Sequence, residues 1–198
     1  MKNKLLVVGT MAYDAIETPF DKVDRILGGA ATYIALACSK FDVDCGLVSV
    51  IGDDFKNSDL KTLTDLDVSI DGVEQVAGEK SFFWSGRYHD DMNGRTTVET
   101  QLNVLENFSP NVPDSYRNAE VMMIGNLHPG VQLTALNQMY GKSRFVVLDT
   151  MNFWMDHFRD TLDEVIAKVD LITINDEEAR QLSEEHSLVK AAEKIHAM

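Results

Sequence analysis

Short apolar segments bounded by turn-forming residues alternate with helix-like segments along the chain, and this alternation is what most limits the possible fold. The apolar segments have the length and low charge of strands buried on both faces; they span residues 5–9, 46–51, 121–125, 145–149 and 171–175. Helix-like segments follow them at residues 30–40, 54–66, 131–140, 162–168, 176–183 and 188–197. The alternation predicts a doubly wound, mostly parallel sheet in a three-layer α/β/α arrangement.

Two segments break this rhythm. Residues 15–27 are too long and too polar for a simple turn between a strand and a helix. In residues 79–105, aromatic and charged side chains alternate, with Trp84 and Tyr88 on one parity and Arg87 and His89 on the other. We expect antiparallel strands with one covered face, which form a small β-sheet lid over the main sheet. No linker-like stretch separates the parts, so residues 1–198 are expected to form one α/β domain with this lid.

The charge balance excludes several classes of partner. With 18 Lys and Arg against 32 Asp and Glu, the formal net charge is −14, which does not suit a nucleic-acid backbone or an anionic membrane surface. No apolar run approaches the length of a membrane span or a secretory leader, so a cytoplasmic protein is expected. The five histidines and the two cysteines, Cys38 and Cys45, lack metal-site spacing, which makes a dedicated transition-metal site improbable.

Candidate ligand-binding residues follow the first predicted strand. Asp14 lies five residues beyond Gly9, near the edge where open α/β sheets hold their ligands. A carboxylate there can accept hydrogen bonds from two vicinal sugar hydroxyls, although a surface Asx turn has the same spacing. Gly28 and Gly29 precede a helix and permit close approach to its N-terminus, and a tight turn would need them equally.

A second candidate site follows the last predicted strand. Asn175 and Glu178 have the spacing of a capping box, in which each side chain accepts a backbone hydrogen bond of the first helical turn. The same oxygen-bearing side chains suit Mg²⁺, its waters and phosphate oxygens at the carboxyl edge of a sheet. The spacing favours both interpretations equally, and one pair of residues can serve both.

Taken together, four motifs resemble the PfkB, or ribokinase-like, family of carbohydrate and nucleoside kinases in their order and spacing. They are Val7-Val8-Gly9 with Asp14, Gly28-Gly29-Ala30-Ala31, Gly52-Asp53-Asp54-Phe55, and Asn175-x-x-Glu178. The resemblance spans essentially the whole chain. It implies a ribokinase-like fold, in which the two irregular segments form a small lid over the sugar.

The resemblance also implies roles for individual residues in ATP-dependent phosphorylation of a sugar hydroxyl. Asp14, Gly28 and Gly29 would contact sugar hydroxyls, and Asn126 would border the substrate. Asn175 and Glu178 would belong to the Mg²⁺ and phosphate network, with Glu178 acting on the metal indirectly. In such enzymes a carboxylate base accepts the proton of the alcohol and a helix N-terminus stabilises charge on the transferred phosphoryl group.

One departure from the family pattern concerns the substrate. The glycine-rich helix usually carries Asn where this chain has Tyr33, whose ring is able to stack on a sugar or a base. The small-molecule substrate is therefore expected to be a sugar or, alternatively, an adenosine-like nucleoside phosphorylated by a kinase of the same fold.

A second departure concerns the catalytic base. The family signature Asp-Thr-x-Gly-Ala-Gly-Asp, which supplies the catalytic Asp, does not occur in the 198 residues. We therefore expect this chain to be the N-terminal two-thirds of a kinase, with the sugar-binding half but no base, and inactive alone. A catalytically inactive sugar-binding remnant is the other hypothesis. Lid strands can also pair between subunits, which predicts a possible homodimer through the lid.

Overall fold

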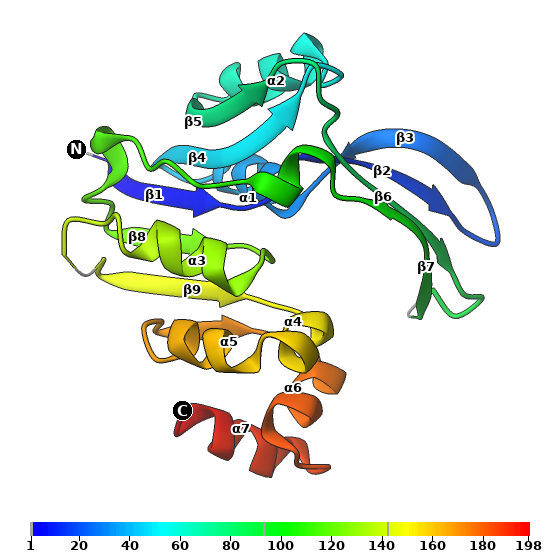
Figure 1. Ribbon diagram of the computed structural model, residues 1–198, viewed down its shortest axis with the longest axis vertical. Coiled ribbons are helices and arrows are strands. Elements are labelled where there is room, and N and C mark those ends of the chain that lie inside the picture. The colour runs from blue at the N-terminus through cyan, green and yellow to red at the C-terminus, as the bar shows by residue number, and fades with distance from the viewer. Residues whose placement is uncertain (1, 93, 142) are drawn as a thin grey trace.

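The computed structural model, which describes residues 2–92, 94–141 and 143–198, contains a central sheet of six parallel strands (Figure 1). In spatial order these are β10 (Leu171–Thr173), β9 (Phe145–Asp149), β8 (Val121–Ile124), β1 (Asn3–Val8), β4 (Val43–Gly52) and β5 (Ser69–Val76). From β1 the chain builds outward through β4 and β5, and then returns to β8 on the other side of β1. The strand order therefore reverses between β1 and β8, as in doubly wound folds.

Helices cover both faces of this sheet, as the sequence predicts. They are α1 (Ala30–Cys38), α2 (Asn57–Thr64), α3 (Pro129–Leu136), α4 (Asn152–His157), α5 (Arg159–Ile166), α6 (Asp176–Ser183) and α7 (Leu188–His196), with short 3₁₀ turns η1 (Asn103–Asn107) and η2 (Asp114–Tyr116). In Figure 1, α3 lies in front of the sheet and α1 behind it. No helix in the described ranges is long and apolar enough to cross a membrane.

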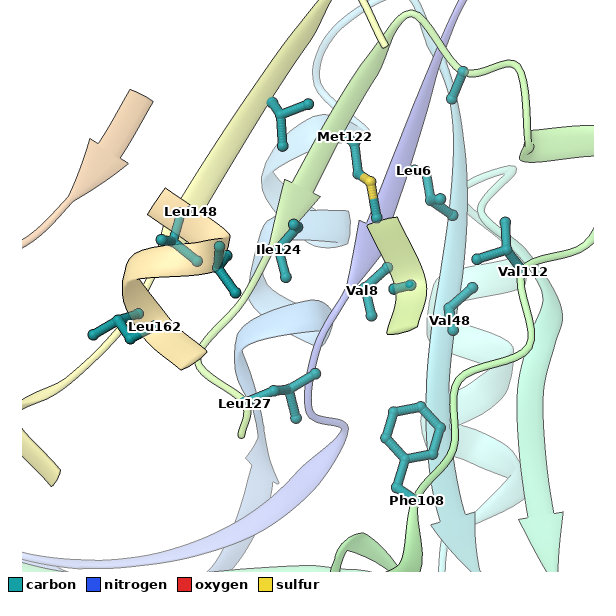
Figure 2. Close-up of a cluster of buried hydrophobic side chains, with 14 of the residues drawn as sticks. Leu6, Val8, Val48, Phe108, Val112, Met122, Ile124, Leu127, Leu148 and Leu162 are labelled. Carbon is teal, nitrogen blue, oxygen red and sulfur yellow. The ribbon is translucent and has the colours of Figure 1, made fainter. Parts of the chain in front are cut away.

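Side chains of β1 alternate between two hydrophobic cores, one on each face of the central sheet. Leu6 and Val8 pack into one core with Ile124 on β8 and Leu162 on α5, as Figure 2 shows. Val7 packs on the opposite face, in the core that α1 and α2 share. Because successive strand residues point to opposite faces, an uninterrupted apolar strand is required when both faces are covered.

Each of the five predicted parallel strands is present, and the sequence analysis missed one strand and one helix. The missed strand, β5, lies at an edge of the sheet, where half of its positions are polar or exposed. The missed helix, α4, has only six residues and no side-chain cap at its start. Edge strands and very short helices need little hydrophobic periodicity, so neither leaves a clear sequence signal.

The two irregular segments form a second sheet, which lies beyond the carboxyl end of β1 (Figure 1). Within the described residues its strand order is β3 (Lys22–Gly28), β2 (Ala12–Glu17), β6 (Phe82–Tyr88) and β7 (Arg95–Gln101). The two hairpins, β2–β3 and β6–β7, are antiparallel as predicted, but β2 and β6 are parallel. The expectation of purely antiparallel strands is therefore wrong where the hairpins meet, because pairing between distant hairpins depends on the tertiary structure.

Arg25 and Tyr13 connect this second sheet to the loop that follows β4. The guanidinium of Arg25 on β3 lies 2.8 Å from Asp54 Oδ2 and stacks 3.9 Å from the centroid of the Tyr13 ring. The Tyr13 hydroxyl donates to Asp59 Oδ2 on α2 at 2.6 Å. Asp54 also accepts the Ser81 backbone N–H at 2.7 Å, just before β6. The acidic Gly52-Asp53-Asp54-Phe55 motif therefore anchors both hairpins of the second sheet.

Candidate active site

The candidate site lies at the carboxyl ends of β1 and β8, where the strand order reverses. The Gly125 N–H donates to the Val8 carbonyl at 2.7 Å, which holds the two strand ends together. A Cβ on Gly125 would lie 3.3 Å from Ala30 Cβ, so α1 begins directly beside these strand ends. Ligands of open α/β sheets bind in the crevice outside such a reversal.

Gly28 and Gly29 bring the chain close to this point. Gly29 has a φ of +92°, and a Cβ there would lie 2.3 Å from the Thr10 carbonyl oxygen. Thr10 also accepts the first amides of α1, since its hydroxyl binds Ala30 N at 3.0 Å and its carbonyl binds Ala31 N at 3.0 Å. These two amides are thus satisfied within the chain, and ligand contacts of Gly28 and Gly29 stay a prediction.

Asp14 lies on β2 with its carboxylate against the end of β3. A Cβ on Gly28 would lie 2.3 Å from Asp14 Oδ2, so glycine at position 28 is what leaves room for this carboxylate. The side chain is about half buried, and this burial raises the pKa of Asp14 above its ordinary value. Within the described residues the carboxylate has no hydrogen bond or ion pair of its own. It is therefore a partly desolvated hydrogen-bond acceptor.

Tyr33 and Asn126 are both held by other residues. The Tyr33 hydroxyl donates to the Leu27 carbonyl at 3.2 Å, and 55% of the residue remains exposed. Asn126 Oδ1 accepts the Trp154 indole N–H at 2.6 Å, so its amide NH₂ group is the part left to donate. Trp154 comes from α4, and the sequence analysis did not single it out.

The structure shows a complete capping box at Asn175 and Glu178. Asn175 Oδ1 accepts the Glu178 N–H at 2.9 Å, and Glu178 Oε2 accepts the Asn175 N–H at 2.9 Å. Glu178 is only 9% exposed. The capping interpretation is thereby confirmed, and Glu178 keeps one carboxylate oxygen outside this pair of bonds.

Asp149, at the end of β9, is a further carboxylate of this region. Burial and the negative charge of Glu178 both raise the pKa of Asp149, while backbone N–H groups of Asn126 and Thr150 lower it. Asn126 therefore contacts α4 through its side chain and Asp149 through its backbone N–H. A carboxylate that closes an apolar strand was the available sequence signal, whereas Asp14 was identified five residues beyond its strand.

Gln132 on α3 fixes the relative position of the two strand ends. Its side chain is fully buried, and its amide donates to the Gly125 carbonyl at 2.9 Å and to the Asp149 carbonyl at 3.1 Å. No sequence pattern indicated this residue, because a single Gln on an otherwise apolar helix predicts nothing about which carbonyls it meets.

A transition metal would need several His, Cys, Asp or Glu side chains close together. Among the described residues there is no group of three or more His, Cys, Asp and Glu side chains able to hold a metal ion. Both cysteines are free thiols, and burial raises the pKa of Cys45 to about 12, so this thiol stays protonated at neutral pH. Cys45 is a buried apolar side chain, and Cys38 is partly buried.

The order of the parallel strands reverses between β1 and β8, and Asp14, Asp149 and Glu178 are the candidate carboxylates of this region. The pfkB family of carbohydrate kinases matches residues 2–198, and the chain belongs to this family of phosphotransferases. It is 28% identical over 196 residues to a cytidine kinase of Thermococcus kodakarensis, a match that covers 97% of this chain and 68% of that enzyme.

Solved structures show the same fold. A nucleoside kinase of Methanocaldococcus jannaschii, described as an archaeal member of the ribokinase family, superimposes with a TM-score of 0.75 at 21% identity, covering 97% of this chain and 68% of that one. The ribokinase of Arabidopsis thaliana, complexed with ribose and ATP, gives a TM-score of 0.71 at 17% identity, covering 100% and 69%. The predicted fold class and family are thereby confirmed.

Proposed function

We propose that the protein takes part in ATP-dependent transfer of a phosphoryl group to a hydroxyl of a sugar ring, with Asp14 as an acceptor for hydroxyls of that ring. The observation that carries this proposal is the environment of Asp14. Its carboxylate is half buried, and no partner in the described chain compensates for the lost hydration. A desolvated carboxylate is stabilised by donors that a ligand supplies, and vicinal hydroxyls are such donors.

Within this activity, we favour a nucleoside over a free sugar as the substrate. The similarity to a cytidine kinase supports this choice, as does Tyr33, whose large exposed ring stands on the helix that follows Gly28 and Gly29. A free sugar is the second candidate, and the fold it shares with a ribose-binding ribokinase supports that reading.

Asn175, Glu178 and Asp149 would face Mg²⁺ and phosphate oxygens through water. Asn175 and Glu178 already accept backbone N–H groups, and the described residues include no cluster of three metal ligands, so this part of the chain suits an indirect contact rather than a direct cage. When bound, Mg²⁺ would neutralise phosphate charge. The amide of Asn126 would donate to the substrate beside them.

We assign proton abstraction to none of these residues. The Asp-Thr-x-Gly-Ala-Gly-Asp signature is absent from the 198 residues, and the cytidine kinase is matched over 68% of its length. The chain is therefore proposed to hold the substrate-binding half and to be inactive by itself. A catalytically inactive sugar-binding remnant is the alternative outcome of the test.

The test is ADP release by the product of the intact gene, with ATP, MgCl₂ and one acceptor at a time: cytidine, adenosine, ribose or fructose. We expect release that depends on the acceptor, with a nucleoside preferred. If ribose or fructose is preferred, the second candidate is correct. If an acceptor binds in calorimetry without any ADP release, the protein is a binding remnant, and if none binds, the proposal is wrong.

Two further proposals concern location and assembly. A cytoplasmic location is proposed, because ATP is the phosphoryl donor. The edges of the second sheet, β3 and β7, are proposed to pair in a homodimer. Sedimentation of a single monomeric species at micromolar concentration would contradict this dimer.

A further inference from the structure

Two aromatic side chains of β6 lie on the same face of the second sheet as Asp14. β2 and β6 pair in parallel, with Ala12 opposite Phe82 and Asp14 opposite Trp84. Side chains of directly paired residues point to the same side of a sheet, and successive residues alternate. Phe82 and Trp84 therefore share the face of Asp14, while Phe83 points to the other face.

Burial divides these three aromatic residues in the same way. Phe83 packs against the core that α1 and α2 share. Among the residues that the structure describes, Phe82 and Trp84 belong to neither hydrophobic core, and both are partly exposed. A tryptophan that adds nothing to a core, on the face that carries the substrate-side carboxylate, calls for an explanation other than packing.

The indole of Trp84 is held in one orientation along the sheet. A Cβ on Gly86 would lie only 2.0 Å from Trp84 Cη2, so the ring passes directly over this glycine. The indole N–H donates to Thr97 Oγ1 at 3.3 Å, and the Arg95 guanidinium lies 5.9 Å from the ring centroid. Both contacts come from β7, which neighbours β6 on the side away from β2. Because its N–H is already bonded, the partly exposed indole can meet a ligand only through its ring carbons.

We propose that Trp84 is the stacking surface for the base of a nucleoside whose ribose hydroxyls meet Asp14. This inference rests on the proposed function and specifies its substrate class. A planar base gains from stacking on an oriented indole, and a free sugar lacks that base, so Trp84 would make the site select nucleosides. Ring orientation before binding lowers the entropy cost of forming the complex.

The two tryptophans of the chain, Trp84 and Trp154, provide a direct test by fluorescence. In the 198-residue chain carrying Trp154→Phe, where Trp84 is the one tryptophan, its emission should be quenched by cytidine and unchanged by ribose at saturating concentration. In the Trp84→Phe variant, the emission of Trp154 should respond weakly to cytidine. The reverse pattern, with strong quenching of Trp154 alone, would place the base against α4 and overturn the inference.

Affinity measurements test the same point by a second route. Trp84→Leu should weaken cytidine binding about tenfold or more, since base stacking on an aromatic ring commonly contributes that much. Ribose affinity should change less than twofold, and Trp84→Phe should restore most of the cytidine affinity. Val98→Thr, at an exposed position of β7, serves as the matched control and should leave both affinities unchanged.

The outcomes separate the inference from the proposed function. If cytidine and ribose bind the unmodified protein but Trp84→Leu weakens both equally or neither, the proposed function stands and the stacking role is wrong. If neither compound nor adenosine binds the unmodified protein, both proposals fall. Melting temperatures of all variants, compared with the unmodified protein, identify any loss of affinity that comes from unfolding.

Discussion

The two sheets of this protein are built on opposite principles. In the central sheet, Leu6, Val7 and Val8 of β1 are completely buried, and β4 is buried along most of its length. In the second sheet, β7 is exposed at six of its seven positions, and β3 is exposed along its first half. Burial of apolar surface on both faces stabilises the first, whereas the second packs Tyr13, Leu27 and Phe83 into a core and is also joined to the β4 loop by the Arg25–Asp54 pair.

This difference separates stability from recognition. A strand buried on both faces must be apolar, so the central sheet offers chemistry only at its carboxyl edge. The second sheet has a face free of that requirement, and there it carries Asp14 and Trp84. Segments with few buried apolar contacts also open at a lower free-energy cost than a core, which suits the lid that the sequence predicts.

The largest expected effect comes from a cavity in the central sheet. Ile124→Ala, at a completely buried position, should lower the free energy of unfolding by about 3–4 kcal/mol. The matched change in the second sheet, Val23→Ala at a position that is 38% exposed, should cost about 0.5 kcal/mol. Urea unfolding measures both, and equal losses would show that the two sheets are not built differently.

Glycine substitutions sharpen the comparison at the boundary between the sheets. Gly29→Ala places a Cβ 2.3 Å from the Thr10 carbonyl oxygen at a φ of +92°, and should cost about 2–3 kcal/mol. Gly78→Ala also has a positive φ, +80°, but nothing lies within 4 Å, so it should cost only about 1 kcal/mol. Thermal unfolding of the two variants separates the effect of the clash from that of the backbone strain. If Gly78→Ala loses as much stability as Gly29→Ala, the clash at position 29 is not the cause of the loss.

Asp14→Asn should weaken substrate binding and slightly increase the stability of the fold at neutral pH. Loss of a charged acceptor should weaken substrate affinity about 10- to 100-fold, measured by calorimetry. Because the folded protein raises the pKa of Asp14, stability contributed by this group falls as pH rises from 3.8 through the raised pKa. The variant should therefore be slightly more stable than the unmodified protein at neutral pH, and this gain should vanish below pH 3.8.

Substrate affinity should follow the same ionisation in the unmodified protein. Binding should weaken as pH falls and Asp14 becomes protonated, with a midpoint above 3.8, and Asp14→Asn should lack this transition. An identical pH profile in both proteins would remove Asp14 from the substrate contacts.

The smallest expected effect tests the capping box against the proposed Mg²⁺ network. Asn175→Ala should lower the free energy of unfolding by about 1 kcal/mol, because one helix N-cap is lost. Glu178→Gln keeps an acceptor for the Asn175 N–H and should change stability by less than about 0.5 kcal/mol. In the intact gene product, Glu178→Gln should nevertheless raise the Mg²⁺ concentration needed for half-maximal ADP release. An unchanged Mg²⁺ requirement would leave Glu178 with a capping role alone.

The predictability of the site differs from residue to residue. Asp14 and the Asn175–Glu178 pair could be named as candidates from the sequence because each comes after an apolar strand, near the edge where such folds bind ligands, and their ligand contacts stay predictions. Asp149 carried the same signal and was passed over. Gln132 and Trp154 were not predictable, because their roles depend on which carbonyl or amide from a distant segment lies within hydrogen-bond distance.

The sequence by itself determined the layered α/β architecture, since buried parallel strands need apolar runs and covering helices need one apolar face, and both patterns are local. The capping box was determined locally as well, by two residues three positions apart. Only the tertiary structure decided that β2 pairs in parallel with β6, which puts Trp84 beside Asp14. It also decided that Gly28 and Gly86 leave the room those two side chains occupy. These outcomes depend on contacts between segments far apart in the chain, which no local pattern encodes.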